Sequence, residues 1–302
     1  MRIRHLLWLA VLTFGVHAAV ARVETSRAAL DWKAIDPALS GATFVGDDTV
    51  CAQCHDDYLA AYEKTRHARS FSSTGRGNCE SCHGPRSLHV DDPGAGEKTW
   101  DEIEPAAQSA VCLQCHEAGS RVHWASAAHP VEDVSCSSCH LVMSRDSRQA
   151  LLIREDSTES CYSCHGDVRA ELLRTSHHPV REGRMDCASC HDLHGSVGPA
   201  ELRGHTVNET CTTCHAEKRG PFLWEHPPVR ESCLNCHEAH GSNHRNLLSG
   251  KDSFVCLACH SYGGHINLPR YNRTSNPYGQ GCVNCHVTTH GSNHPSGAKQ
   301  TR

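Results

Sequence analysis

Bulky apolar side chains are scarce in this sequence. Its 302 residues include only 5 Phe, 5 Trp, 6 Tyr and 3 Met. Such residues normally fill the core of a domain, so side-chain packing alone is not expected to stabilise a chain of this length. The sequence is instead rich in two residue types, with 20 Cys and 26 His. These residues indicate either a disulfide framework or a set of bound metals or haems.

Long apolar runs are also missing, apart from one of eleven residues at 6–16. That run follows Arg2 and Arg4 and precedes small residues at 19–21. The pattern predicts a secretory signal peptide over residues 1–21, cleaved after Ala21. A retained membrane anchor is the alternative, but a membrane span needs about 20 apolar residues. No Cys lies near the cleavage point, which argues against a lipid anchor.

The mature chain is therefore expected to be soluble and exported, with no transmembrane segment of its own. Loss of Arg2 and Arg4 removes two positive charges and changes the formal net charge from -5 to -7. A mildly acidic protein is a poor partner for nucleic acid.

All the Cys residues fall in ten copies of the pattern Cys-x-x-Cys-His, with none left over. The Cys residues are Cys51, Cys54, Cys79, Cys82, Cys112, Cys115, Cys136, Cys139, Cys161, Cys164, Cys187, Cys190, Cys211, Cys214, Cys233, Cys236, Cys256, Cys259, Cys282 and Cys285. The motif His residues are His55, His83, His116, His140, His165, His191, His215, His237, His260 and His286.

This pattern is the attachment signature of c-type haem. Two thiols three positions apart reach the two vinyl groups of one haem and form thioethers, and the following His supplies an axial nitrogen to the iron. The motifs therefore predict ten covalently bound haems, which would provide the apolar mass that the side chains lack.

Two other interpretations use the same Cys spacing. Zinc ribbons contain Cys-x-x-Cys pairs, but they do not need a His directly after each pair. Disulfides within each motif would suit an oxidising compartment, but they leave the ten motif His residues without a role. Haem attachment explains both residue types.

The motifs are arranged in five pairs, which begin at Cys51, Cys112, Cys161, Cys211 and Cys256. A His-Gly-Ser sequence follows the second motif in the last three pairs, at residues 194–196, 240–242 and 290–292. The repeating unit is a di-haem segment of about fifty residues, which is typical of a quasi-linear repeat protein. We therefore expect a decahaem domain at 51–302, preceded by an N-terminal leader or linker at 22–50.

The expected fold is a loop-rich multihaem cytochrome c with short α-helices, little or no β-sheet and an elongated array of di-haem repeats. Residues 58–71 and 167–176 have helical spacing of their apolar positions, and Pro179 is expected to end the second helix. The remainder is rich in Gly, Pro, Ser and Asn, which favour loops.

Sixth ligands for the irons must come from outside the motifs. Apart from the motif His residues and His5 and His17 in the predicted signal peptide, 14 His remain. This number is enough for an array in which most haems have two His ligands. Repeat position favours His67, His89, His129, His178, His194, His226, His240, His265 and His290 as ligands, with His244 and His294 next. We expect His123, His177 and His205 to be ordinary surface residues.

Met143 interrupts the repeat pattern. In the third and fourth pairs a His stands three residues after the second motif His, at His194 and His240, whereas the second pair has Met143 there. The expected role of Met143 is packing, with the missing ligand drawn from His123 or His177. A haem with His and Met ligands is the alternative, and such ligation would raise its reduction potential.

Two stretches resemble a known family in detail. Residues 224–244 read WEHPPVRESCLNCHEAHGSNH, and residues 282–297 read CVNCHVTTHGSNHPSG. Together with the ten motifs and the predicted signal peptide, they resemble the periplasmic decahaem cytochromes of porin–cytochrome conduits, the MtrA/DmsE family. The resemblance covers residues 51–302, and Met143 departs from the His expected at that position.

The resemblance implies an electron-transfer protein that docks within an outer-membrane β-barrel porin and serves extracellular electron transfer. Its implied partners are the porin, a periplasmic electron carrier, and an outer-surface cytochrome or terminal oxidoreductase. A free periplasmic shuttle to a reductase is the alternative. A multihaem enzyme needs an iron with an open distal site, and no sequence signature here marks one.

A pyridine haemochrome assay of the mature protein is expected to give ten haems per chain, because each motif attaches one. A mature protein made with a working haem-maturation system that was colourless, or that contained zinc, would contradict the haem interpretation.

Overall fold

The computed structural model describes residues 29–74, 78–94, 96–144, 150–260 and 281–300. The chain divides into a unit of residues 1–30 and a unit of residues 31–302, and all of the helices and strands named below lie in the second. The predicted signal peptide at 1–21 and His265 lie outside the described residues.

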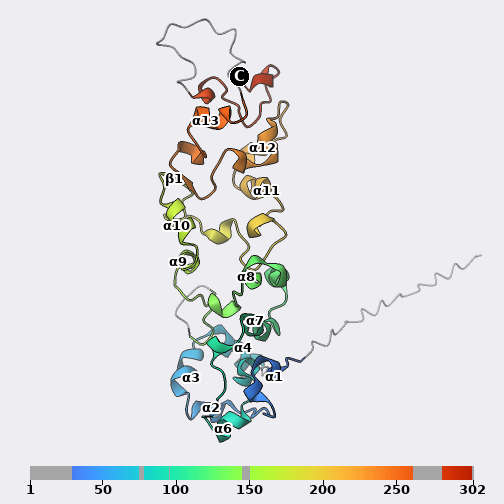
Figure 1. The fold of residues 1–302 in the computed structure, drawn as a ribbon, viewed down its shortest axis with the longest axis vertical. Coiled ribbons are helices and arrows are strands. Elements are labelled where there is room, and N and C mark those ends of the chain that lie inside the picture. The colour runs from blue at the N-terminus through green and yellow to red at the C-terminus, as the bar shows by residue number, and fades with distance from the viewer. Residues whose placement is uncertain (1–28, 75–77, 95, 145–149, 261–280, 301–302) are drawn as a thin grey trace, which may run out of the picture. The chain divides into compact units, whose positions relative to one another are not determined.

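Short helices joined by loops make up the described chain (Figure 1). The α-helices are α1 (Trp32–Ile35), α2 (Asp48–Ala52), α3 (Asp56–Tyr62), α4 (Arg66–Thr74), α5 (Glu80–His83), α6 (Ser87–Asp91), α7 (Pro105–Leu113), α8 (Ala128–Val131), α9 (Ser157–Tyr162), α10 (Gly166–Leu172), α11 (Val207–Thr212), α12 (Pro227–Glu231) and α13 (Asp252–Leu257). The prediction of a loop-rich fold with short helices is confirmed. Within the described residues, no helix has both the length and the apolar character needed to cross a membrane.

Several loops contain a single turn of 3₁₀ helix. These turns are η1 (Pro37–Leu39), η2 (Trp100–Glu102), η3 (Gly119–Arg121), η4 (Trp124–Ser126), η5 (Cys136–Ser138), η6 (Cys187–Ser189), η7 (Pro199–Glu201), η8 (Ala216–Lys218), η9 (Cys233–Asn235), η10 (Arg245–Leu247), η13 (Cys282–Asn284) and η14 (Gly297–Lys299).

Sheet structure is minimal, as expected. In the described part of the chain, β1 (Ser176–His177) and β2 (Gly241–Ser242) form a two-stranded antiparallel sheet. Ser176 is opposite Ser242, and His177 is opposite Gly241. The strands belong to different repeats, so this small sheet links neighbouring di-haem segments.

The two helices predicted from periodicity differ from those observed. The predicted helix at 58–71 is divided into α3 and α4, and the fully buried Thr65 lies at the break. The Thr65 hydroxyl accepts a hydrogen bond from the Ala68 backbone N–H at 3.3 Å, which satisfies a donor at the start of α4. The helix predicted at 167–176 ends at Leu172, before Pro179 could stop it, because Ser176 already pairs in the sheet.

A side-chain core is almost absent, in agreement with the composition. The buried hydrophobic residues in the described chain are Ile35, Leu39, Ala68, Ile103, Val111, Trp124, Ala127 and Leu172. Each buried apolar side chain contributes about 1.5–3 kcal/mol at most. So few of them cannot offset the conformational entropy of ordering a chain of this length.

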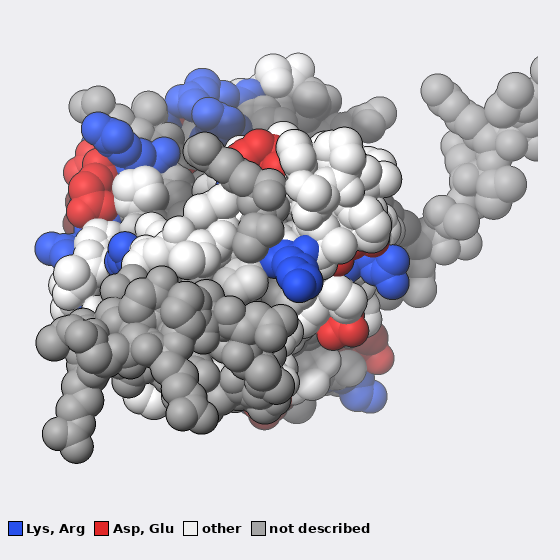
Figure 2. Space-filling view, turned by 90° about the horizontal axis from the view of Figure 1, so that it is seen from above, with Lys and Arg blue, Asp and Glu red and all other residues white. Residues whose placement is uncertain are grey.

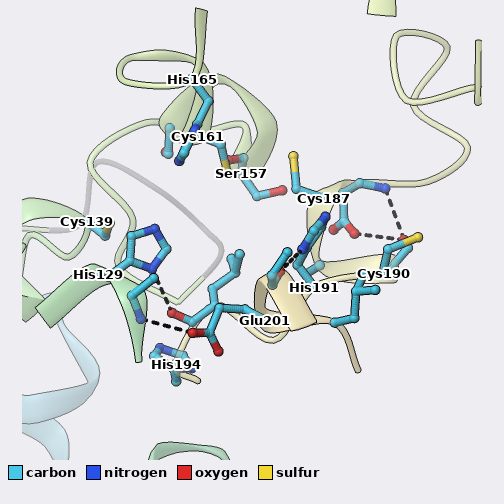
Figure 3. A pocket seen from close by; sticks show the side chains of 18 of the residues that line it. His129, Cys139, Ser157, Cys161, His165, Cys187, Cys190, His191, His194 and Glu201 are labelled. Carbon is cyan, nitrogen blue, oxygen red and sulfur yellow. Dashed lines mark hydrogen bonds between the residues drawn. The ribbon is translucent and has the colours of Figure 1, made fainter. Parts of the chain in front are cut away.

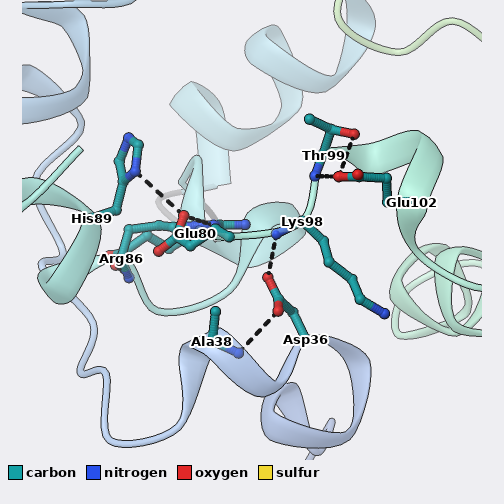
Figure 4. Close-up of polar contacts among 9 residues, drawn as sticks. Asp36, Ala38, Glu80, Arg86, His89, Lys98, Thr99 and Glu102 are labelled. Atoms are coloured by element: carbon teal, nitrogen blue, oxygen red, sulfur yellow. Dashed lines mark hydrogen bonds and ion pairs between the residues drawn. The ribbon is translucent and has the colours of Figure 1, made fainter. Parts of the chain in front are cut away.

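Two buried carboxylates connect the N-terminal segment to the chain around the second motif (Figure 4). Asp36 accepts hydrogen bonds from the backbone N–H groups of Ala38 and Lys98, both at 3.0 Å. Glu80 accepts from the N–H groups of Val45 at 2.9 Å and Gly46 at 2.7 Å. The described part of the predicted leader is therefore packed against the domain, and α2 crosses the predicted boundary between residues 50 and 51.

Replacement of Glu80 by Gln tests this connection. Glu80 also accepts a hydrogen bond from the Arg86 backbone N–H at 2.9 Å, so its two oxygens serve three backbone donors. An amide nitrogen would face at least one of these donors, so we expect Glu80→Gln to lower the free energy of unfolding by about 1–3 kcal/mol. Denaturant unfolding followed by circular dichroism would measure the change. The control is Glu63→Gln at an exposed site, and an equal effect of both variants would contradict the connection.

Candidate functional site

All ten Cys-x-x-Cys-His motifs adopt the same backbone turn. In each motif, the N–H of the second Cys and the N–H of the His both donate to the carbonyl oxygen of the first Cys. The N···O distances are 3.1–3.3 Å for the Cys and 2.9–3.1 Å for the His. The turn therefore presents two thiols and one imidazole in the same way ten times.

The two motifs of a pair begin in different local structures. The first Cys of each first motif lies in the last turn of a short α-helix, namely α2, α7, α9, α11 or α13. Asp47, Asp156 and Thr206 cap three of these helices by accepting from a backbone N–H group. The second motifs begin on the 3₁₀ turns η5, η6, η9 and η13, except for the second motif of the chain, which begins immediately before α5.

All twenty Cys side chains are free thiols, so the disulfide interpretation has no support in the structure. Within each pair, the first thiols of the two motifs are neighbouring partners, and the first thiol of the second motif shifts the pKa of the first thiol of the first motif. These partners are Cys51 with Cys79, Cys112 with Cys136, Cys161 with Cys187, Cys211 with Cys233, and Cys256 with Cys282.

A second set of neighbouring thiols lies between each pair of motifs and the next. Burial, and after it the charge of a neighbouring thiolate, raises the pKa of Cys82, Cys139, Cys190 and Cys236. The respective neighbours are Cys115, Cys164, Cys214 and Cys259. Neighbouring thiols that shift each other's pKa therefore occur between every motif and the next in chain order, across all nine steps from the first motif to the tenth.

Eight motif imidazoles each face a second imidazole across a gap. The pairs and their ring-centroid distances are His55 and His89 at 6.2 Å, His116 and His67 at 5.9 Å, His140 and His194 at 6.1 Å, His165 and His129 at 6.3 Å, His191 and His240 at 6.3 Å, His215 and His178 at 6.3 Å, His237 and His290 at 6.1 Å, and His260 and His226 at 6.1 Å.

The spacing of these rings fits one iron between them. Two imidazoles on opposite sides of one metal, each with a metal–nitrogen bond of about 2 Å, place their ring centroids roughly 6 Å apart. Direct stacking of aromatic rings in contact would allow shorter distances. The residues present therefore fit the two axial positions of a haem at eight of the motifs.

The other candidate ligands are placed as follows. His244 and His294 are exposed, and the His294 Nδ1 accepts hydrogen bonds from Ser296. His205 is exposed, and both ring nitrogens of His177 are engaged, by the Arg174 carbonyl and by Glu182. Within the described residues, none of these four imidazoles faces a motif imidazole in the ring pairs above.

A hydrogen bond orients the motif imidazole in four of the second motifs. The Nδ1 atoms of His140, His191 and His237 contact the carbonyl oxygens of Ala150, Ala200 and Asn246, each at 2.8 Å. His286 Nδ1 likewise contacts the Lys299 carbonyl at 2.7 Å. A bond at Nδ1 leaves Nε2 free for a metal, which is how ligating His residues are usually held. His83 makes no such bond to a carbonyl within the described chain.

Sequence reasoning missed these carbonyl acceptors. Ala150, Ala200 and Asn246 have positive φ angles of 51°, 51° and 56°. This left-handed backbone costs about 1–2 kcal/mol per non-glycine residue, so neighbouring contacts must hold it. The available sequence signal was a Leu two residues after each acceptor, at Leu152, Leu202 and Leu248.

Contacts between repeats also orient three of the imidazoles that face a first-motif His. The Nδ1 atoms of His129, His178 and His226 contact the carbonyl oxygens of Leu193 at 3.3 Å, Ala239 at 2.7 Å and Thr289 at 3.0 Å. Each acceptor immediately precedes another paired imidazole, at His194, His240 or His290. The corresponding His67 Nδ1 is buried and has no partner within the described residues, so the first junction between repeats departs from the other three.

The Gly that follows each of His194, His240 and His290 permits close packing of the backbone. A Cβ atom at Gly241 would lie 2.0 Å from the Glu171 carbonyl oxygen, well inside van der Waals contact. Gly195 has a φ of +104°, and a Cβ there would lie 2.8 Å from the His123 carbonyl oxygen. The His-Gly-Ser sequence is therefore a packing element as well as a source of imidazole.

One continuous cavity of about 5650 Å³ is lined by residues from all ten motifs, and Figure 3 shows part of it. Ordinary small-molecule pockets measure about 300–1,000 Å³, so this cavity has room for several large ligands. Apolar side chains on its walls remain uncovered, and Phe44, Tyr58 and Leu234 are 58%, 63% and 47% exposed. Bulky apolar cofactors would cover this surface.

Burial favours the neutral form of several of the paired imidazoles. It is the main cause that lowers the pKa of His67, His116, His194 and His290. A neutral imidazole has a free lone pair, as metal ligation requires.

The zinc interpretation finds little support in the structure. Within the described residues, the one group of at least three close metal-type ligands is Asp48, Cys51 and Cys79. A structural zinc site needs four ligands in a tetrahedron. Asp48 instead accepts a hydrogen bond from the Cys79 N–H at 2.9 Å, so its position has a local explanation.

Family models for two kinds of cytochrome sequence match the chain. The doubled Cys-x-x-Cys-His motif matches residues 129–170, 177–220 and 226–265. The model for cytochrome c554 and c-prime matches residues 50–78 and 90–141.

Two curated proteins are similar to the chain. The multihaem cytochrome MtrA of Shewanella baltica is 38% identical over 231 residues, which cover 72% of this chain and 69% of that protein. The cytochrome c-type protein NrfB of Escherichia coli is 25% identical over 128 residues, which cover 40% of this chain and 67% of that protein.

Replacement of His226 tests the ring pairs. Loss of the imidazole opposite His260 is expected to leave one haem of ten with a single His ligand, so His226→Ala should add a high-spin signal of that size. Electron paramagnetic resonance of the oxidised protein would measure it. His244→Ala at an exposed site is the matched control, and a wholly low-spin spectrum of His226→Ala would contradict the pairing.

Proposed function

Because the chain belongs to the MtrA family of multihaem c-type cytochromes, we propose that it carries electrons along ten covalently bound haems held in one series. Haem iron supplies a one-electron redox centre when bound. The residues of the chain determine where these centres lie, how each is ligated and which neighbours it has.

The observation that supports a series is the set of nine pairs of neighbouring thiols, one pair for each step from a motif to the next. Each thiol would be the attachment point for one edge of a haem, and the neighbouring thiols run from motif to motif in chain order. Neighbouring attachment points would bring the edges of consecutive haems together. Such an arrangement would suit conduction, because electrons would pass between haems whose edges lie close together.

The proposed ligands follow from the geometry. The twenty motif Cys residues hold ten haems, the ten motif His residues provide one axial nitrogen each, and the facing imidazoles provide the second at eight irons. The assignment of most haems as bis-His leaves no open distal position at those sites. Substrate turnover at an iron needs such a position, so the ligand set favours an electron carrier over an enzyme.

We also propose the finer role, which is passage of electrons across the outer membrane inside a β-barrel porin. Membership of the MtrA family and the decahaem pattern at 51–302 support it, as does the predicted signal peptide at 1–21. A large barrel has a polar lumen that could accept a protein. The face seen in Figure 2 shows acidic and basic side chains in small separate groups. The partners would be the porin, a periplasmic carrier and an outer-surface cytochrome or terminal oxidoreductase.

Extraction of the tagged chain from the native membrane tests the conduit. In mild detergent, an outer-membrane β-barrel is expected to co-purify with the chain in equal amounts, because docking inside a lumen buries a large surface. Quantitative mass spectrometry of the complex would measure the ratio. Complete recovery of the chain in the periplasmic fraction would contradict the conduit and favour the alternative, a free periplasmic shuttle.

A further inference from the structure

A regular rule gives the second imidazole at three of the second motifs. His140 faces His194, His191 faces His240, and His237 faces His290. In each case, the facing residue comes three or four positions after the motif His of the next second motif along the chain. Each repeat therefore supplies an axial ligand to the repeat before it.

Extension of this rule by one repeat pairs His83 with residue 143. His83 belongs to the second motif of the first pair, and the second motif of the next pair ends at His140. The residue three positions after His140 is Met143. The haem of Cys79 and Cys82 thus has a Met where its counterparts have a His.

Backbone hydrogen bonds place residue 143 in the same type of turn as its counterparts His194 and His240. The N–H groups of Leu141, Asp192 and Glu238 donate to the carbonyls of Leu151, Glu201 and Leu247, each at 2.7 Å. On the other side of this turn, the N–H groups of Ile153, Arg203 and Ser249 donate to the carbonyls of Cys139, Cys190 and Cys236, each at 2.9 Å. Two matching backbone hydrogen bonds and an isolated β-bridge at each motif His therefore define the same turn in all three repeats.

Neither of the His residues expected from sequence to replace the missing ligand is suitably placed. Both ring nitrogens of His177 are engaged, Nδ1 with the Arg174 carbonyl at 2.7 Å and Nε2 with Glu182 at 3.2 Å. The backbone of His123 lies against Gly195, beside the His140–His194 pair, where an imidazole already faces the motif His.

One other ring lies near His83. The centroid of Trp100 is 6.2 Å from that of His83, with the planes inclined at 70°. An indole N–H is a donor with no lone pair to offer, so Trp100 cannot ligate iron. A thioether sulfur is a weak acceptor that does bind haem iron, and His with Met is an established axial pair.

We propose that the Met143 sulfur is the sixth ligand of the haem attached to Cys79 and Cys82, opposite His83. The proposal rests on the function proposed above, since it requires haem at that motif. A Met ligand raises the reduction potential relative to a second His. The second haem of the series is then the one that holds an electron most firmly, next to the N-terminal end of the array.

Spectroscopy of the oxidised protein provides the first test. A Met-ligated ferric haem has a weak red absorption band from sulfur-to-iron charge transfer, and we expect this band at the intensity of one haem in ten. Met143→His restores the ligand pattern of the other repeats, so it should abolish the band, keep all haems low-spin and lower the highest midpoint potential of the redox titration. Met143→Ala should abolish the band and make one haem in ten high-spin.

Met185→Leu is the matched control, because the chain has only 3 Met and Met185 is the only one besides Met1 and Met143. It should keep the band and every potential. A wild-type protein without the band would overturn the Met143 assignment, as would Met143→Ala with the band retained. A pyridine haemochrome count below ten would instead refute the decahaem proposal, so the two failures are distinguishable.

Discussion

The imidazole pairs across a shared gap are the interaction on which the rest of the structure depends. Seven of the eight pairs take their two rings from different repeats, and the exception is His55 with His89. The described chain buries very few apolar side chains and forms one sheet of two short strands. Metal ligation between repeats would therefore replace the packed core that holds an ordinary repeat protein together.

Local backbone hydrogen bonds position the thiols and imidazoles as metal ligation would require. The turn common to all ten motifs fixes the thiols and the first imidazole, and the carbonyls of Ala150, Ala200 and Asn246 fix the ring orientation in three of the second motifs. The left-handed residues at these carbonyls cost conformational energy. That cost is consistent with a functional constraint, since strained backbone tends to persist where surrounding contacts require it.

Much of this arrangement could be predicted from the sequence. The ten motifs are local patterns, and their spacing gave the loop-rich fold with short helices and almost no sheet. The eight facing imidazoles are among the His residues expected from repeat position, but the motif that each one faces was not predicted, because seven of these rings come from another repeat. His244 and His294 looked like good candidates by repetition, yet both are exposed. The division of the helix at 58–71 was also missed, because the buried Thr65 that breaks it acts through tertiary contacts.

The serial order of the haems is the central claim, and a structure of the haem-loaded protein tests it most directly. Electron cryo-microscopy of the purified holoprotein would show all ten irons and the edges of their porphyrins. The neighbouring thiols predict that each haem lies against the haems of the preceding and following motifs, in chain order from Cys51 to Cys285. A branched array, or consecutive motifs whose haems are separated by protein, would contradict the account.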